Sequence, residues 1–365
     1  MLLGYAHLRP YGDPMRSRRA VSAILLIAVA LTPSLAFAQV TPPAAPQLAI
    51  GTANDQAFAL DLVQKLNAEK FDDLDQIAAQ LRRDKTRVRG GYWKLAMFYG
   101  YLDRPLLNDK DSVDHLEHLR HWVAARPESI TARIALARSL HRWAWVARGN
   151  GFANTLTPEM VKLFTERSRE SLSVLESAEK LGTMDPEWYL QMMAAGVALE
   201  WDHTRMQSVF DRGVAFEPGF FYLYTSYANY LLPKWYGKPG DAANFAKESA
   251  DRIGGDDGDI LYFRIATVLV SRSNGNFPVD ELDWHRILHG YTMLNQTYGA
   301  VWGYVNQLAY MAYKFNDREV AQQQFALIGD HWLPAVWRDK LFFDRARDWS
   351  TGRTSLPSTN PATSE

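Results

Sequence analysis

The chain has 365 residues, a formal net charge of −1 and no cysteine. This length is enough to bury a hydrophobic core without disulfides, and the lack of cysteine excludes thiol catalysis and cysteine-based zinc or iron–sulfur sites. The near balance of charge argues against nucleic acid or an anionic membrane as the main partner.

The first 38 residues form a predicted secretory signal peptide. Met15 is the better start, because arginines at 16, 18 and 19 precede an apolar run over 20–31 and the small-x-small cleavage sequence Ala36-Phe37-Ala38. The apolar run is too short for a stable membrane span. Cleavage after Ala38 leaves Gln39 where a lipoprotein needs cysteine. We therefore expect a periplasmic or secreted protein without an integral membrane span; the alternative is an uncleaved N-terminal anchor.

Beyond a flexible lead-in at 39–53, apolar residues recur at helical spacing as far as residue 348, and no stretch alternates long enough to predict a sheet. The sequence thus predicts an all-α domain over 54–348 and a disordered tail over 349–365. Its helices are expected near 54–66, 71–81, 92–102, 112–125, 129–147, 158–181, 186–199, 203–216, 219–232, 241–253, 258–272, 280–297, 300–314, 317–328 and 335–347.

The helix near 112–125 carries three histidines. A helical wheel places Leu116 and Leu119 toward the core and His115, His118 and His121 on the opposite face. Exposed imidazoles beside carboxylates can bind zinc, which makes His115 and His118 metal candidates. The competing interpretation is a solvated helix face, and we favour it because no spacing here completes a known metal signature.

Two segments repeat one pattern of a large residue, a small neighbour, a turn aspartate and a second apolar ladder. The matching positions are Met193, Ala194, Val197, Asp202, Met206, Phe210 and Gly213 in the first, and Leu308, Ala309, Ala312, Asp317, Ala321, Phe325 and Ile328 in the second. This is the layout of a tetratricopeptide-like helical hairpin. Further copies begin at Leu136 and Tyr227, with interruptions at 141–157 and 233–241. Four copies suffice for a continuous core, so we predict a single elongated α-α hairpin solenoid.

The segment 233–241 has two prolines and two glycines, which predict a rigid loop that presents Trp235 and Tyr236. Such aromatic side chains next to lysines can stack on a sugar or hold a peptide, although they can equally fold back over the hairpin core. Stacked hairpins expose a concave face built from their first helices. Tyr222, Asn229 and Tyr230 lie on such a helix and complete the predicted binding residues.

Two further polar groups lie between 254 and 289. The acidic turn at 254–259 resembles a calcium loop only in composition, so we interpret it as a turn with Asp259 near the next helix start. Glu281, His285 and His289 form an outward row at a spacing of four. His285 and His289 are the second pair of metal candidates, and either could also act as a base in a groove.

The common catalytic and phosphate-binding motifs are missing from the sequence: G-x-S-x-G, H-E-x-x-H, Walker A and G-x-G-x-x-G. Their absence lowers the odds of the common enzyme classes without excluding an unusual one. We therefore expect no cofactor.

Two segments together resemble a known family. One runs from Phe71-Asp72-Asp73-Leu74 to Gly91-Tyr92-Trp93-Lys94-Leu95, and the other from Tyr227-Ala228-Asn229-Tyr230-Leu231-Leu232-Pro233-Lys234-Trp235-Tyr236-Gly237 to Gly258-Asp259-Ile260-Leu261-Tyr262. They resemble an uncharacterised bacterial family, a domain of unknown function found in exported proteins with tetratricopeptide-like helices. The resemblance covers most of 55–345. It implies the helical fold and carries no catalytic or ligand residue.

The sequence therefore favours an exported helical-repeat protein that binds a protein or peptide in the cell envelope. The alternative is a periplasmic all-α hydrolase or lyase acting on cell-wall polymer, suggested by the many tryptophans and the outward histidines. A deep cleft in which His285 or His289 meets a carboxylate would favour the enzyme. An exposed apolar patch around Trp332, Trp337 and Phe342 would instead favour a structural role in a larger envelope complex.

Overall fold

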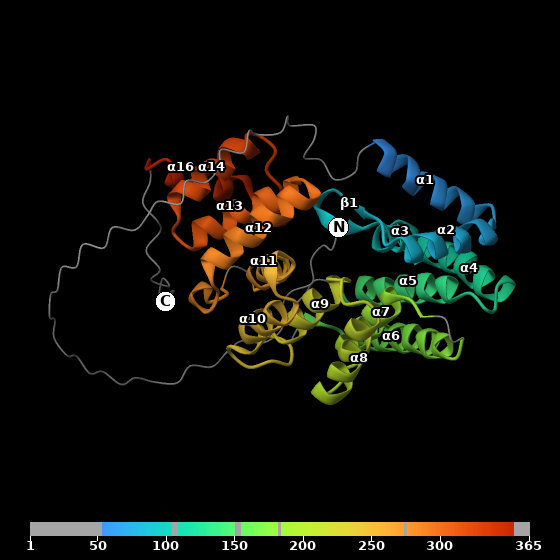
Figure 1. The fold of residues 1–365 in the computed structure, drawn as a ribbon. Coiled ribbons are helices and arrows are strands. Elements are labelled where there is room, and N and C mark those ends of the chain that lie inside the picture. The colour runs from blue at the N-terminus through green and yellow to red at the C-terminus, as the bar shows by residue number, and fades with distance from the viewer. Residues whose placement is uncertain (1–52, 104–108, 150–154, 182–183, 274–275, 354–365) are drawn as a thin grey trace.

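The computed structural model describes residues 53–103, 109–149, 155–181, 184–273 and 276–353 (Figure 1). Within these ranges the chain is helical almost throughout. The predicted signal peptide, residues 39–52 of the lead-in and residues 354–365 of the tail lie outside the described residues. No helix of the described part is long and apolar enough to cross a membrane.

Most of the chain is built from pairs of consecutive helices that pack on each other. The pairs are α5 (Ile130–Arg148) with α6 (Pro158–Glu179), α7 (Pro186–Ala198) with α8 (His203–Phe216), α9 (Tyr222–Tyr230) with α10 (Asp241–Ile253), α11 (Gly255–Arg272) with α12 (Trp284–Tyr298), and α13 (Trp302–Lys314) with α14 (Arg318–Ile328). Before them come α1 (Ala53–Asn67), α2 (Phe71–Asp84), α3 (Lys94–Leu102) and α4 (Asp109–Ala125), and after them α15 (Pro334–Trp337) and α16 (Lys340–Ser350).

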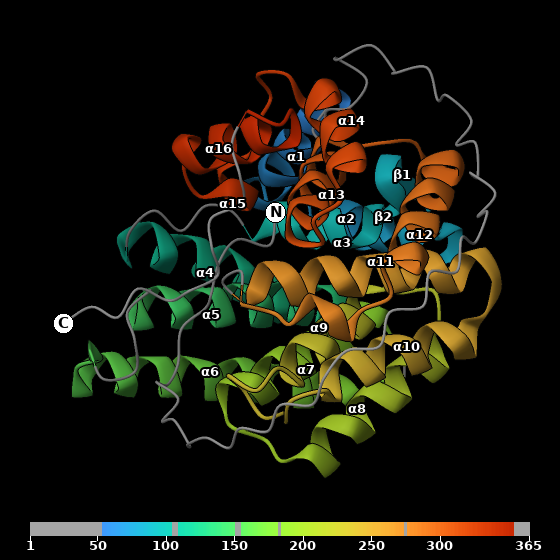
Figure 2. The same ribbon diagram turned by 90° about the vertical axis from the view of Figure 1, so that its left-hand side faces the viewer.

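The hairpins stack through their first helices. Helices α3, α5, α7, α9, α11 and α13 contact one another in that order and form an inner row, and the second helices lie outside it (Figure 2). The predicted all-α, solenoid-like fold is confirmed, and all four predicted hairpins are present. How the chain divides into domains stays a prediction.

The turn aspartates of the repeat pattern cap the second helix of their hairpins. Oδ1 of Asp202 accepts a hydrogen bond from the backbone N–H of Arg205 at 2.8 Å, and Asp317 does the same for Val320 at 3.0 Å. Each carboxylate thus satisfies a backbone donor that the first helical turn leaves unpaired. The spacing of the pattern therefore fixes where these helices begin.

An unpredicted strand pair precedes α3. Strands β1 (Arg87–Val88) and β2 (Tyr92–Trp93) are antiparallel, and a 3₁₀ turn, η2 (Arg89–Gly91), joins them. The turn packs against α12 (Figure 1). Gly91 has a φ of +66°, and a Cβ there would lie 2.4 Å from the Arg264 guanidinium, so only glycine fits.

The inner row is covered on all sides near its centre. Tyr92 stacks on Tyr304 with ring centres 5.5 Å apart, and Trp93 meets Phe220 edge-on at 5.1 Å. Within α7 and α9, both fully described, no residue is exposed. The expected concave face built from first helices is therefore closed over these two helices, because the strand pair and its neighbours pack against it.

Several helix boundaries differ from the sequence prediction. Helix α5 continues to Arg148, so residues 141–148 of the presumed interruption at 141–157 are helical. The helix expected near 280 begins at Trp284, because the Asp283 side chain caps it there. The single helix expected near 335–347 is divided into α15 and α16, and α16 runs to Ser350 and buries Trp349, beyond the predicted domain end at 348.

Candidate functional site

An open groove of about 610 Å³ runs along α8. Six of its lining residues occupy three successive turns of that helix, and the seventh comes from α9. They are His203, Thr204, Gln207, Ser208, Asp211, Arg212 and Tyr227. The groove is thus one polar face of α8 with an aromatic residue at its floor.

The amphipathic pattern of α8 explains why this face is free. Met206, Val209, Phe210 and Gly213 are buried against neighbouring helices, which turns the residues at 203–204, 207–208 and 211–212 away from the core. Gly213 allows a close approach, since a Cβ there would lie 3.0 Å from both Leu223 and Tyr189. Side chains at successive turns therefore form one continuous row.

A chain of hydrogen bonds orders the centre of the groove. The hydroxyl of Tyr227 donates to Oε1 of Gln207, and Nε2 of Gln207 donates to Oδ1 of Asp211 at 2.8 Å. Tyr227 is only 3% exposed, whereas Asp211 is exposed. The three groups therefore lead from the buried floor to solvent with every donor pointing outward.

The charges around the floor are mainly negative. Burial raises the pKa of Tyr227 to about 12, and the charges of Asp211 and Asp241 contribute in the same direction. Arg212 also lines the groove, but its guanidinium pairs with Glu179 on α6 at 2.6 Å. After burial and the neighbouring Tyr230, two carboxylates thus add to the raised pKa of the Tyr227 hydroxyl, one on α8 and one at the first residue of α10.

The loop at 233–241 meets one end of the groove. The His203 ring lies within hydrogen-bonding distance of the Tyr236 carbonyl, with 2.7 Å between Nε2 and the oxygen, and it contacts the Tyr230 ring edge-on at 5.2 Å. Gly237 is required here, because a Cβ would lie 1.8 Å from the Leu231 carbonyl oxygen. The rigid loop predicted from sequence therefore helps to shape the groove.

Two of the five predicted binding residues lie beside this groove and serve the core. Tyr230 is fully buried, and its hydroxyl donates to the Trp201 carbonyl at 3.1 Å. Tyr236 is half-buried, and its hydroxyl donates to the Val197 carbonyl at 3.0 Å. Their packing explains why the loop keeps its shape.

The other three lie apart from the groove. Trp235 is half-buried and meets Trp145 edge-on at 6.4 Å. Asn229 is half-buried on α9. Tyr222 lies in the inner row, where burial raises its pKa well above the usual value and the charge of Glu187 adds to the shift. A binding role for these five residues stays a prediction.

The histidines of α4 do not share one exposed face. His121 is exposed and lies 3.1 Å from a carboxylate oxygen of Glu69, but His115 and His118 are half-buried. Burial lowers the pKa of His115, which the backbone of Leu102 contacts. The wheel misplaced these two side chains because it considers one helix alone and ignores neighbours such as the end of α3.

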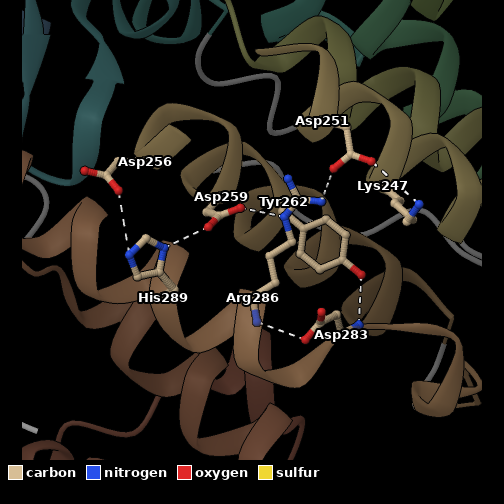
Figure 3. A network of polar contacts seen from close by, with 8 residues as sticks. All are labelled: Lys247, Asp251, Asp256, Asp259, Tyr262, Asp283, Arg286 and His289. Atoms are coloured by element: carbon tan, nitrogen blue, oxygen red, sulfur yellow. Dashed lines mark hydrogen bonds and ion pairs between the residues drawn. The ribbon is translucent and has the colours of Figure 1, made fainter. Parts of the chain in front are cut away.

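His285 and His289 are exposed on α12, as the sequence predicts, whereas Glu281 lies before the helix in η4 (Val279–Glu281). Figure 3 shows the network around His289. Its Nδ1 lies 2.7 Å from Asp259, whose other oxygen accepts from Arg286 at 2.5 Å. Arg286 also pairs with Asp251 of α10 at 2.6 Å. This network joins three helices at the surface.

A second ionic network, which sequence reasoning missed, lies among the inner helices. Arg138 of α5 pairs with Asp103, at 3.2 Å, and with Glu187 of α7. Arg82 of α2 pairs with Asp185 at 2.7 Å. Glu187 and Asp185 are fully buried, and burial raises the pKa of Glu187 to about 7 despite the nearby Arg138.

No group of three or more histidine, aspartate or glutamate side chains in the described part of the chain is placed to hold a metal ion. The groove residues were also missed at the sequence level. Their spacing of four residues can be seen in the sequence. It does not single out this helix, because every outer helix of a solenoid has such a polar face. What distinguishes this one is the contact of Tyr227 on α9 with Gln207, which joins residues 20 positions apart.

Comparison with protein families gives one match. Residues 59–199 match the model of DUF4034, a domain of unknown function. Comparison with the curated proteins and with the solved structures gives no match. The matched residues contain the whole Arg138 network, and the groove along α8 lies just beyond them. The match supports an uncharacterised domain of unknown function over 59–199; it includes the first segment that carries the resemblance, at 71–95, and not the second, at 227–262.

Proposed function

We propose that this chain is an exported helical-repeat protein of the cell envelope that binds a segment of a protein or peptide in the groove along α8. The observation that carries the proposal is the groove itself: a row of polar side chains over three helical turns, ordered by hydrogen bonds and open to solvent. Preorganised polar side chains lower the entropic cost of binding.

The geometry around His289 supports binding over the alternative of a cell-wall hydrolase or lyase. Its imidazole does meet a carboxylate, but the side chain is 47% exposed and Arg286 already occupies the same carboxylate. A general base needs its partner in a site that excludes water and holds substrate. The pair is instead typical of a surface network.

The C-terminal aromatic residues do not form the exposed patch that a structural envelope subunit would present. Trp337 is fully buried, and Trp332 and Phe342 are half-buried around it. This observation also favours the groove as the contact surface.

Photo-crosslinking tests the binding proposal. A photoreactive amino acid at Ser208, in the groove, is compared with one at Lys162, an exposed position on α6. We expect a discrete crosslinked partner from position 208 in intact cells and none from 162. Equal products from both positions, or none from position 208 with the protein folded, would contradict the proposal.

Export is tested separately. Residues 1–53 are fused to alkaline phosphatase, which is active only outside the cytoplasm. Activity that is lost when the arginines at 16, 18 and 19 become glutamate supports the signal peptide. An inactive fusion would contradict export without affecting the groove.

A further inference from the structure

The chemistry of the groove narrows the class of its partner. Helix α8 spans about 14 Å between residues 203 and 212, at a rise of ~1.5 Å per residue. An extended peptide advances ~3.3 Å per residue, so about four residues of partner fit along the row. The chemistry of the groove then indicates which kind of partner side chain lies over Tyr227, at the centre of the row.

The hydrogen bonds at the floor leave acceptors free. Tyr227 uses its proton on Gln207, so its oxygen can only accept a further bond. Asp211 accepts from Gln207 and retains further acceptor sites as a carboxylate. A ligand group at this point must therefore donate.

The charges at the floor also favour a ligand group that donates hydrogen bonds and carries a positive charge. The charges of Asp211 and Asp241 both act on the Tyr227 hydroxyl, whereas the guanidinium of Arg212 is offset by Glu179. Phe245, half-buried on α10, packs edge-on against the Tyr227 ring at 5.0 Å and holds that ring in place. A tyrosine ring beside a carboxylate suits the alkyl stem and charged head of lysine or arginine.

We infer that the groove takes a basic peptide segment, with one lysine or arginine side chain seated on Tyr227 beside Asp211 and with the charge of Asp241 adding to the attraction. The inference rests on the proposed binding function and specifies its partner. The hydroxyls of Thr204 and Ser208 then face the backbone of the segment on either side of the seated side chain.

Fluorescence anisotropy with the full chain tests this. Three labelled eight-residue peptides share an alanine, serine and glycine background and carry four lysines, four glutamines or four glutamates. We expect the lysine peptide to bind at least tenfold more tightly than the other two. Its affinity should fall as the salt concentration rises from about 0.05 to about 0.5 M, because salt shortens the Debye length and screens the attraction between the lysines and the carboxylates.

Matched variants locate the site. Asp211→Asn and Asp241→Asn should each weaken binding of the lysine peptide about threefold to fivefold, the range expected for one solvent-accessible ion pair. Asp251→Asn removes the same charge from α10, but within the Arg286 network, and should leave affinity unchanged. Circular dichroism confirms that each variant is folded.

The outcomes separate the two proposals. Equal binding of all three peptides would overturn the basic-segment inference and leave the binding function standing. Lysine-peptide binding that neither groove variant weakens would overturn the placement at Tyr227. A crosslinked partner at Ser208, combined with no binding of the lysine peptide, would again overturn the inference alone.

Discussion

Arg138 and Arg286 perform the same task in two different environments. Each bridges two carboxylates from neighbouring segments: Asp103 and Glu187 for Arg138, and Asp251 and Asp259 for Arg286. Glu187 is fully buried and Asp251 is half exposed at 52%. The pairing geometry alone therefore does not distinguish the two sites.

Burial reverses the electrostatic outcome. At the inner site, loss of solvent raises the pKa of Glu187 to about 7, although Arg138 opposes the shift. At the surface site, the hydrogen bond from Arg286 lowers the pKa of Asp251. Desolvation outweighs pairing in the first case and is outweighed in the second. Disturbing the inner network should therefore lower the free energy of unfolding strongly, and its contribution should change with pH near neutrality. Neither is expected of the surface network.

The largest difference is expected on removal of each arginine. Arg138→Gln leaves the buried Glu187 without a cation, while Asp103 keeps only Arg142 at 3.6 Å, and should lower the free energy of unfolding by about 3–5 kcal/mol. Urea denaturation followed by circular dichroism at pH 7 measures this. A loss below about 1 kcal/mol would show that solvent reaches the inner network.

His141 lies one turn from Arg138, and burial, aided by the charge of Arg138, lowers its pKa to about 4. A histidine neutral in the fold but protonated when unfolded destabilises the fold as pH falls from about 6.5 to 4. The contribution is about 3 kcal/mol. His141→Gln, which retains an acceptor for Trp145, should abolish this loss; unchanged pH dependence of urea unfolding in the variant would refute the assignment.

Glu187 should act in the opposite direction over an overlapping range. Because its pKa is raised in the fold, its contribution to stability is fully present below about pH 4.5 and is lost as pH rises through about 7. Glu187→Gln should therefore remove the part of the stability loss that wild type shows between pH 5 and pH 8 on account of Glu187. Wild type and variant are compared at pH 5 and pH 8, and a variant that loses more stability at pH 8 would contradict the argument.

The smallest effect is expected at the surface. Arg286→Gln should cost about 1 kcal/mol or less, and 0.5 M salt should reduce that cost further. The same urea experiment serves here. A cost equal to that of Arg138→Gln would remove the contrast between the two sites.

The sequence predicted what local patterns specify. Asp202 and Asp317 cap helices because an aspartate before an amphipathic run satisfies free N–H groups within four residues. The apolar faces of α8 and α14 followed directly from their spacing. Helix α8 has the predicted ends, and α10 likewise.

Features formed by residues far apart in the sequence could not be predicted from local patterns. Arg138 and Glu187 are 49 residues apart, and each reads alone as an ordinary charged position on a helix. The groove depends on contacts of α8 with Tyr227 on α9 and with Tyr236 in the loop at 233–241, which no local pattern encodes. The strand pair before α3 was missed, and Tyr92 and Trp93 were assigned to the following helix, because four strand residues are too few to show alternation.

That strand pair also imposes an order on biosynthesis. The Trp93 indole donates to the Gly219 carbonyl, and Gly90 exchanges contacts with the Gly299 carbonyl and the Arg264 guanidinium. The ribosome synthesises Gly219, Arg264 and Gly299 long after it has synthesised the two strands. In a nascent chain, β1 and β2 therefore lack these contacts until residue 299 has emerged. The inner row of helices is then covered late in synthesis, when nearly the whole helical region is available.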